Sequence, residues 1–227
     1  MNSPKTTVSA AGQRSTAYYE TWTLDTYDLW VLGFINTFGW RCGTKKHLLP
    51  AFRASVRPNH MDIGVGTGYY LKHVDFPGSL TLCDLSRSAL EMARSRSGRD
   101  DVQLIHCDIT QELPTDEKYQ SISMFYLLHC LPGPITNKTA VIHRVTSNLT
   151  TDGILAGATI LGRGVKDGWV GKLWRRHVNR RGHLDNNDDD AESFISALND
   201  NFEHVETEIV GAVLIFKAQR PKAVGMS

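Results

Sequence analysis

The chain has 227 residues, 41% hydrophobic and 22% charged, so it can bury a substantial core and lacks the composition of a disordered protein. Its 25 lysines and arginines against 24 acidic residues leave a net charge of +1. This balance gives no electrostatic reason to expect nucleic acid or an anionic membrane as a partner.

The four cysteines, Cys42, Cys83, Cys107 and Cys130, are widely spaced and form no C-x-x-C pair. We therefore expect no metal site and no disulfide framework. Cys83 and Cys107 stand in apolar runs and are expected to be small buried residues. The N-terminal stretch has no apolar core of a secretion signal, and no window approaches the ~20 apolar residues of a membrane span. The sequence predicts a cytoplasmic protein.

The chain divides into an N-terminal part and a core. Residues 1–16 are polar and are predicted to form a flexible arm. Residues 17–56 are rich in aromatic side chains and are predicted to form a helical lid segment that Pro50 interrupts. Over residues 57–220 strand and helix patterns alternate, with an insertion at residues 162–190 before the last helix. We predict that this third range is the ligand-binding core.

Five apolar runs in the core are predicted to be strands: residues 60–65, 80–85, 102–109, 121–128 and 154–161. Apolar strands that alternate with helices are typical of a parallel sheet covered on both faces. Near the end of the chain, two strand patterns meet at Gly211, and strands joined so closely must form an antiparallel hairpin. The predicted fold class is α/β, a doubly wound, mostly parallel seven-stranded sheet with one antiparallel strand from a C-terminal hairpin.

The first predicted strand runs into a glycine loop, Gly64-x-Gly66-x-Gly68. This spacing differs from the G-x-G-x-x-G of dinucleotide sites, where a helix N-terminus holds a pyrophosphate. The loop contains no lysine or arginine and follows the acidic Asp62. It therefore favours a ligand that approaches the backbone closely without presenting phosphate groups.

Two further carboxylates stand at the ends of the next two predicted strands. Asp84 ends the second strand, 22 residues after Asp62, in the place where a carboxylate accepts hydrogen bonds from ribose hydroxyls. Asp108 ends the third strand, where a carboxylate can accept from the exocyclic amine of adenine. All three lie at the carboxyl edge of the sheet, where open α/β sheets bind ligands. Three carboxylates and a glycine loop without lysine or arginine indicate a cationic adenosine derivative, and S-adenosylmethionine fits that description.

From about residue 17 to 218, the chain resembles the class I S-adenosylmethionine-dependent methyltransferases of the small stand-alone type. HMDIGVGTGYYL resembles the family's first motif, LTLCDLS its acidic second motif and IHCDI its third. SISMFYLLHCLPG resembles the segment after strand four, and NLTTDGILAGATILG the fifth-strand motif. Tyr119-Gln120 stands where the family usually has an acidic residue. The resemblance implies methyl transfer to a small molecule, including natural products, with S-adenosylhomocysteine as the product.

The resemblance also implies the cofactor contacts. Asp62 would orient the loop and meet the methionine amine through water, Asp84 would take the ribose hydroxyls and Asp108 the adenine. Tyr126 would face the methionyl end, and the loop glycines would lie under the methionyl and ribose parts. The predicted cofactor residues are Asp62, Gly64, Gly66, Gly68, Asp84, Leu85, Asp108, Ile109 and Tyr126.

Methyl transfer is an in-line displacement at an activated carbon, so the protein mainly has to position the acceptor. A base is needed when the acceptor arrives protonated, as a phenol or an alcohol does. His129, which follows the fourth strand, is the candidate catalytic base. The alternative is a histidine hydrogen-bonded within the LLHCLPG turn.

Aromatic side chains of the lid segment and of the insertion are the candidate acceptor-binding groups, with ordinary packing as the alternative. They are Tyr18, Tyr19, Tyr27, Trp40 and Trp169. The predicted partner is a small-molecule acceptor, methylated most simply at oxygen and less simply at nitrogen or carbon. Two other functions stay open: a cyclase or binding module that holds the cofactor without methyl transfer, and an NAD(P)-dependent oxidoreductase, which the loop spacing opposes. The acceptor's identity and the oligomeric state are not specified by the sequence.

Overall fold

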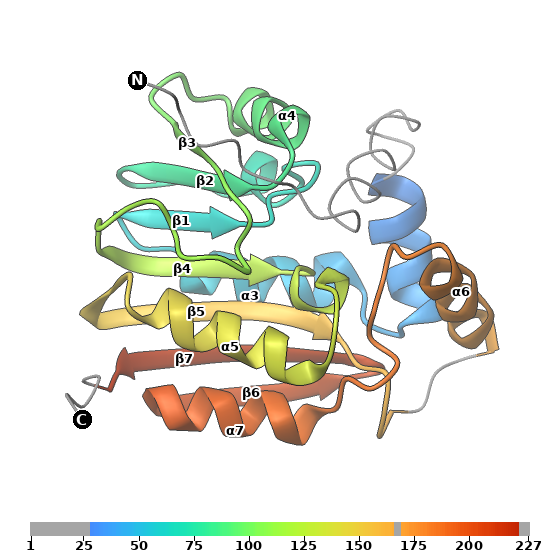
Figure 1. Cartoon of the computed structure of the whole chain (residues 1–227). Coiled ribbons are helices and arrows are strands. Elements are labelled where there is room, and N and C mark those ends of the chain that lie inside the picture. Colours follow the sequence, from blue (N-terminus) through green and yellow to red (C-terminus); the bar gives the residue numbers. More distant parts are fainter. Residues whose placement is uncertain (1–27, 166–168, 223–227) are drawn as a thin grey trace, which may run out of the picture.

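The computed structural model describes residues 28–165 and 169–222. Its centre is a seven-stranded sheet in the order β3-β2-β1-β4-β5-β7-β6, which runs from top to bottom in Figure 1. The strands are β1 (His60–Ile63), β2 (Leu80–Asp84), β3 (Gln103–His106), β4 (Tyr119–Phe125), β5 (Leu149–Ile160), β6 (Phe202–Val210) and β7 (Val213–Pro221). β1 to β5 pair in parallel, and β7 runs antiparallel between β5 and β6. The predicted fold class is confirmed.

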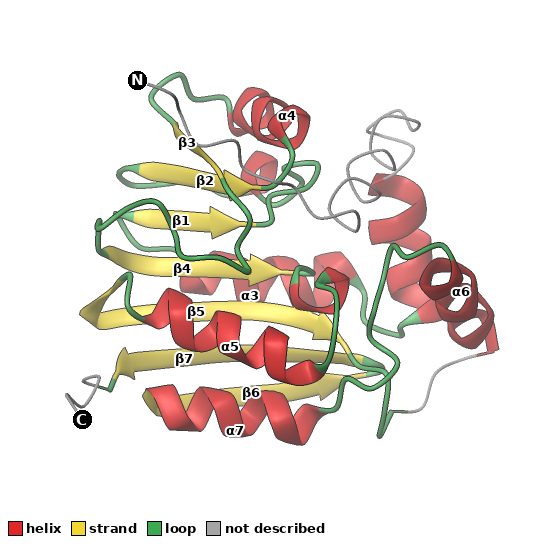
Figure 2. Cartoon of the chain, in the orientation of Figure 1, coloured by secondary structure: helices red, strands yellow, loops and turns green. Residues whose placement is uncertain are grey.

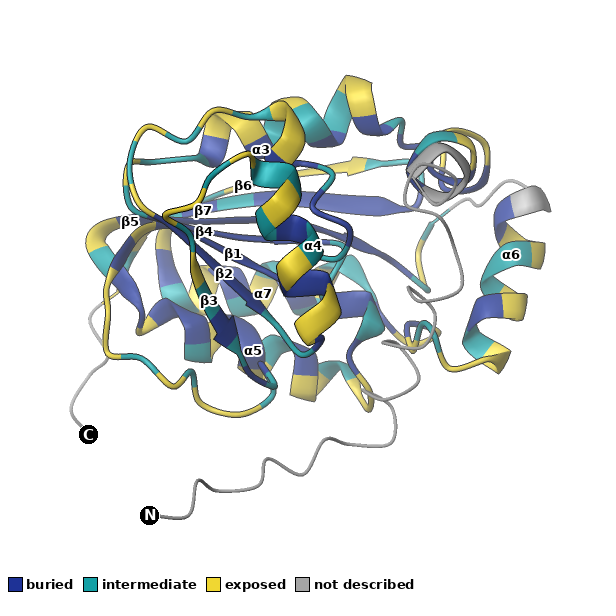
Figure 3. Cartoon of the chain, turned by 90° about the horizontal axis from the view of Figure 1, so that it is seen from above, coloured by how far each residue is buried: buried dark blue, intermediate teal, exposed yellow. Residues whose placement is uncertain are grey.

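Helices cover both faces of the sheet (Figure 2). One face carries α3 (Leu49–Ser55) and α4 (Arg87–Ser97), and the other carries α5 (Ile135–Thr146) and α7 (Ala191–Asn201). Each face has its own apolar cluster, and the strands β1, β2, β4 and β5 between them are buried along most of their length (Figure 3). Burial on both sides explains why the central strands have nearly continuous apolar sequences.

Two strands, β3 and β4, end three residues before their predicted apolar runs do, and each ends where the backbone must turn. β3 stops at His106, after which the Asp108 carboxylate accepts hydrogen bonds from Thr110 and forms a turn. β4 stops at Phe125 because Tyr126 has a φ of 63°, in the left-handed region. Asp108 and Tyr126 are therefore loop residues at the carboxyl edge of the sheet. β5, in contrast, begins at Leu149, ahead of its predicted start.

The described part of the N-terminal segment contains η1 (Asp28–Gly39), η2 (Thr44–Leu48) and α3. Pro50 lies in the first turn of α3, where a missing N–H breaks no helical hydrogen bond. Pro50 therefore stands at the change from η2 to α3, with helical backbone on both sides of it. No helix within the described ranges is both long enough and apolar enough to cross a lipid bilayer.

Beyond the carboxyl ends of the parallel strands, α6 (Trp169–Arg180) lies beside η1 (Figure 1). Gly39 and Gly171 lie at this contact, where a Cβ added to Gly39 would stand 3.6 Å from Cα of Gly171, an ordinary van der Waals distance. We call η1, α6 and the segment up to Asp190 the cap. The insertion predicted at residues 162–190 contains α6.

A buried ion pair fastens the cap to the sheet. Nζ of Lys138, on α5, lies 2.7 Å from Oδ1 of Asp189, and both side chains are excluded from solvent. The same ammonium donates to the carbonyl of Asp185, whose N–H donates to the carbonyl of His129 at 2.9 Å. Removing one partner of a buried pair leaves an uncompensated charge, so this connection resists opening. It holds the end of the cap against the turn that follows β4.

Candidate active site

A pocket with a volume of about 400 Å³ lies at the carboxyl edge of the sheet, under the cap. Its floor comes from the loops after β1, β2, β3 and β4, and its roof from η1, α6 and the following segment. Eight of the nine predicted cofactor residues line it: Asp62, Gly64, Gly66, Asp84, Leu85, Asp108, Ile109 and Tyr126. The structure thus brings together side chains from four separate loops.

The three loop glycines have positive φ angles of 75°, 52° and 71° in chain order, a conformation that disfavours residues with a side chain. A Cβ on Gly64 would also come within 2.8 Å of Cδ1 of Leu127. Gly68 does not line the pocket, and a Cβ there would lie 2.7 Å from Cα of Ala93 on α4. Gly68 therefore lets α4 pack under the loop, whereas Gly64 and Gly66 form part of the floor.

Asp62 is a buried carboxyl group in the pocket floor, with 4% of the residue exposed. Its Oδ1 accepts a hydrogen bond from Oγ of Ser123 at 2.5 Å. Burial raises the pKa of Asp62 to about 7, and the Coulomb repulsion of Asp84 adds to this effect. A cation beside the carboxyl would favour its ionised form. An ammonium group is therefore the ligand that this side chain suits.

Asp84 and Asp108 are both oriented by backbone hydrogen bonds. Oδ1 of Asp84 accepts from the N–H of Ser86 at 2.8 Å, and Oδ2 accepts from the N–H of Gly66 at 3.4 Å. Oδ1 of Asp108 accepts from the N–H and the hydroxyl of Thr110, at 2.9 and 2.7 Å. Burial raises the pKa of Asp84, and the backbone N–H groups act against that rise. Each carboxylate keeps lone pairs for a ligand in the pocket that both residues line.

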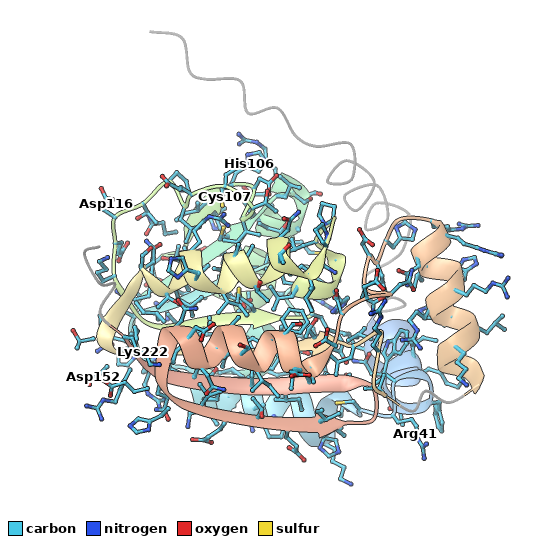
Figure 4. The ribbon with its side chains drawn as sticks, turned by 60° about the horizontal axis from the view of Figure 1, so that its bottom comes forward. Arg41, His106, Cys107, Asp116, Asp152 and Lys222 are labelled. Atoms are coloured by element: carbon cyan, nitrogen blue, oxygen red, sulfur yellow. The ribbon has the colours of Figure 1, made fainter. Side chains whose placement is uncertain are left out.

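Leu85 and the end of β3 support the same corner of the pocket. The carbonyl of Leu85 is 2.9 Å from Nε2 of His106, which Figure 4 labels beside Cys107. Cys83 and Cys107 are buried, as predicted, and their sulfur atoms lie 2.8 Å apart under the pocket. Burial and the contact with Cys107 raise the pKa of the Cys83 thiol, so it is a neutral packing group.

These groups fit an adenosyl sulfonium better than a dinucleotide. Three carboxyl side chains line the pocket, and none of the lining residues in the described part of the chain is a lysine or an arginine. A pyrophosphate would face uncompensated negative charge here, whereas an ammonium and a sulfonium would gain from it. The glycine floor allows the ligand to lie directly on the backbone.

Comparison with known proteins decides the family. Residues 61–153 match the family model described as "Methyltransferase domain". The chain is 50% identical over 214 residues to the "Physcion biosynthesis cluster O-methyltransferase" of Aspergillus chevalieri, covering 92% of this chain and 96% of that protein. The chain belongs to the class I S-adenosylmethionine-dependent methyltransferases.

Further comparisons agree with this membership. The methyltransferase is 47% identical over 207 residues to the "N-methyltransferase vrtF" of Penicillium aethiopicum, covering 90% of this chain and 87% of that protein. Its fold matches the crystal structure of the N-methyltransferase NodS from Bradyrhizobium japonicum WM9 in complex with S-adenosylhomocysteine. That match has a TM-score of 0.64 at 18% identity and covers 92% of this chain and 100% of the other. The predicted family and cofactor are confirmed, and the oxidoreductase alternative falls away.

The roof of the pocket in this methyltransferase is mostly apolar and aromatic. Its described residues include Leu32, Trp40, Ile160, Trp174, Val178 and Leu184. Of the predicted acceptor-binding residues, Trp40 lines the pocket and packs in an apolar cluster with 2% exposure. Tyr18, Tyr19 and Tyr27 lie outside the described residues. Trp169 is the first residue of α6, and its side chain also lies outside the described part.

His129, in η4 (Leu128–Cys130), lines the pocket but is held in a form that does not suit a base. Its Nδ1 accepts the backbone N–H of Ile160 at 3.1 Å. A nitrogen that accepts an N–H cannot itself carry a proton, so the neutral ring carries its proton on Nε2. Burial, with a smaller contribution from Lys138, lowers the pKa of His129 to about 3. The ring therefore carries its only N–H on Nε2, and the geometry does not support the predicted base.

The backbone turn at Tyr126 precedes η4 and so determines where His129 lies. Its φ of 63° is rare for a residue with a side chain, and its N–H donates to the carbonyl of Ala158 at 2.8 Å. The Tyr126 ring meets the His129 ring edge-on, with the ring centroids 5.3 Å apart. The left-handed turn ends β4 and directs the chain into η4. Backbone strain of this kind is frequent at functional sites.

Asn36, Trp174 and Val178 line the pocket and are not among the residues predicted from the sequence. Asn36 stands between Ile35 and Thr37 in an otherwise apolar helical stretch, and this interruption by polar residues is the only sequence signal of a special role. Trp174 and Val178 are four positions apart on α6 and so share one helical face. That spacing is also typical of ordinary packing.

The titration of Asp62 gives a testable pH dependence. Because its pKa in the free protein is about 7, we expect the affinity for S-adenosylhomocysteine to fall when the pH is lowered from 8 to 6. The protonated carboxyl must lose its proton before it can pair with the ammonium, so the loss approaches about tenfold per pH unit below 7. Calorimetric titration across this range, in buffers of different ionisation enthalpy, measures both the affinity and the released proton.

The matched control for Asp62 is Asp62→Asn, whose amide oxygen can still accept the hydrogen bond from Ser123. This variant should bind S-adenosylhomocysteine more weakly than the wild type and with little pH dependence. A wild-type affinity that stays constant from pH 8 to pH 6 contradicts the assignment of the ammonium contact to Asp62.

Proposed function

We propose that this methyltransferase methylates an oxygen of a small, largely apolar aromatic acceptor, and that no side chain acts as a general base. The observation that carries the proposal is the division of charge in the pocket. Among the described lining residues, the carboxylates Asp62, Asp84 and Asp108 all belong to the floor, at the carboxyl ends of β1, β2 and β3. The roof offers aromatic and aliphatic side chains with only uncharged polar groups, which suits a planar neutral ligand.

S-adenosylmethionine, when bound, supplies a methyl group activated by a positively charged sulfur. The residues of the chain bind and orient the acceptor and exclude water around it. His129 is well suited to a further task, because its Nε2–H can donate to the acceptor oxygen and stabilise it as an oxyanion. The hydroxyl proton then leaves to solvent, and the acidity of the acceptor itself sets how much of it is reactive.

The relatives support an oxygen acceptor without requiring one. The related proteins of Aspergillus chevalieri and Aspergillus niger are named as O-methyltransferases, and vrtF is named as an N-methyltransferase. We favour oxygen because His129 offers a donor where a protonated amine would need an acceptor. Nitrogen is the second candidate.

A panel of acceptors of equal shape tests this proposal. The purified protein is incubated with S-adenosylmethionine and with naphthols, naphthoic acids and naphthylamines, and methylated products are identified by mass spectrometry. We expect methyl ethers from naphthols to exceed the other products. Methylation of the amines alone would replace oxygen by nitrogen. Cofactor binding without any methylated product would favour a non-methylating role instead.

We further propose that residues 17–56 act as a lid and residues 162–190 as an acceptor-side insertion. The described parts of both ranges, η1 and α6, contribute the roof of the pocket, which supports this division. A flexible arm at residues 1–16 and a cytoplasmic location stay predictions from the sequence.

A further inference from the structure

Asn36 is a fully buried polar residue in the roof of the pocket, with 0% of its surface exposed. Its backbone carbonyl accepts the N–H of Cys42 at 2.7 Å, and its Nδ2 donates to Oγ1 of Thr44 at 2.8 Å. Its side-chain Oδ1 is buried and has no hydrogen-bond partner within the described structure. A buried acceptor without a partner is unfavourable unless a ligand completes it.

The orientation of the Asn36 amide follows from its neighbour. Oγ1 of Thr44 donates its single proton to the carbonyl of Leu32. The hydroxyl oxygen can therefore only accept from Asn36, and only the NH₂ group of the amide can donate. Nδ2 is thus fixed toward Thr44, and rotation of the amide by 180° would set two acceptors against each other. The oxygen of Asn36 is left without a partner among the described residues, on a side chain that lines the pocket.

We propose that Asn36 Oδ1 accepts a hydrogen bond from a second, non-reacting hydroxyl or N–H group of the methyl acceptor. This inference rests on the proposed function, because it concerns the acceptor of the same site. An amide oxygen repels an oxyanion, so it cannot face the oxygen that is methylated. His129 offers the donor for that oxygen, and Asn36 offers the acceptor for another group.

The two fixed groups define a substrate class. The acceptor is an aromatic compound with at least two polar substituents, of which one reacts as an oxyanion and another stays protonated. Apolar side chains make up most of the surrounding roof, so a missing donor on the substrate would leave Asn36 Oδ1 unsatisfied. Asn36 is therefore a specificity-determining residue, and it rejects acceptors that lack the second donor.

Isomeric dihydroxynaphthalenes, each compared with the naphthol that lacks the second hydroxyl, provide the test. Their affinities are measured by titration into protein saturated with S-adenosylhomocysteine, and their kcat/KM values are measured with S-adenosylmethionine. In the wild type, we expect at least one dihydroxy isomer to exceed its naphthol by about tenfold or more in both measurements. In Asn36→Leu this ratio should fall to about one.

A further variant separates recognition from folding. Thr44→Ser keeps the hydroxyl that fixes the Asn36 amide, and it should keep the preference for the dihydroxy isomer. Unchanged affinity for S-adenosylhomocysteine identifies variants whose pocket is folded.

The outcomes distinguish this inference from the proposed function. If Asn36→Leu retains the wild-type ratio, recognition by Asn36 is overturned while O-methylation stands. If dihydroxy isomers bind with the predicted preference but are never methylated, recognition stands and the proposed function is overturned. If the wild type shows no preference for any dihydroxy isomer, in binding or in turnover, the inference is overturned as well.

Discussion

Replacing Asp84 by alanine is expected to weaken binding of S-adenosylhomocysteine by at least about 100-fold. The proposed ribose contact consists of two hydrogen bonds to a charged group, and the loss of each is worth about 1.5 kcal/mol or more. The loop would also loosen, because the two carboxylate oxygens bond the N–H groups of Ser86 and Gly66. Isothermal titration with S-adenosylhomocysteine measures the loss directly.

Two control variants test whether the loss of affinity in Asp84→Ala comes from the carboxylate in the cofactor site. Asp84→Asn keeps the shape and one accepting oxygen, so we expect a smaller loss of about tenfold. Asp116→Ala removes an exposed aspartate from the loop before β4 (Figure 4) and should leave the affinity unchanged. If Asp84→Ala binds as tightly as Asp116→Ala, the ribose contact has to be assigned to another residue.

A pair of substitutions at His129 separates a hydrogen-bond donor from a base. In His129→Asn, Oδ1 can take the place of Nδ1 and accept the N–H of Ile160, but no donor reaches the pocket. In His129→Gln, Nε2 keeps a donor in the pocket, while the Ile160 N–H loses its partner. We expect kcat/KM for a phenolic acceptor to fall about 100-fold in His129→Asn and about tenfold or less in His129→Gln. The unfolding temperatures should show the opposite order, with His129→Gln less stable than His129→Asn because the Ile160 N–H has lost its partner.

The pH dependence of the wild type provides an independent check of His129. With a pKa of about 3, the ring is neutral throughout the pH range from 6 to 9, so it contributes no inflection there. We expect kcat/KM to rise with pH and to level off near the pKa of the acceptor hydroxyl. A more acidic acceptor should move the midpoint down by the difference in hydroxyl pKa values. A midpoint that stays fixed across acceptors, and disappears in both His129 variants, would restore the base.

The residues of the pocket floor could be predicted because they occur in short local sequence motifs. Gly64 and Gly66 have to be glycine for backbone reasons, and Asp84 and Asp108 each follow an apolar strand. Parallel strands then bring these separate motifs to one edge of the sheet. Residue type, spacing and topology agree at each position, so few alternative structures compete.

The acceptor half depends on contacts that no local pattern specifies. Whether His129 presents a lone pair or an N–H depends on Ile160, which is 31 positions away in the sequence. The free oxygen of Asn36 depends on a chain of hydrogen bonds through Thr44 to Leu32. The predicted end of β4 is wrong for a related reason. The apolar run SISMFYLL continues past Phe125, but the backbone turns at Tyr126. In each case tertiary contacts override the local signal.

The cap has a consequence for how acceptor preference can change between related enzymes. The matched methyltransferase domain ends at residue 153, whereas Asn36 and Trp174 belong to η1 and α6, outside that range. The cap reaches the sheet through the buried Lys138–Asp189 pair, away from the glycine loop. Substitutions on η1 and α6 can therefore alter which compound is methylated without disturbing how the methyl donor is held. Substrate names should be transferred between relatives on the likeness of these two helices, and not on the likeness of the domain beneath them.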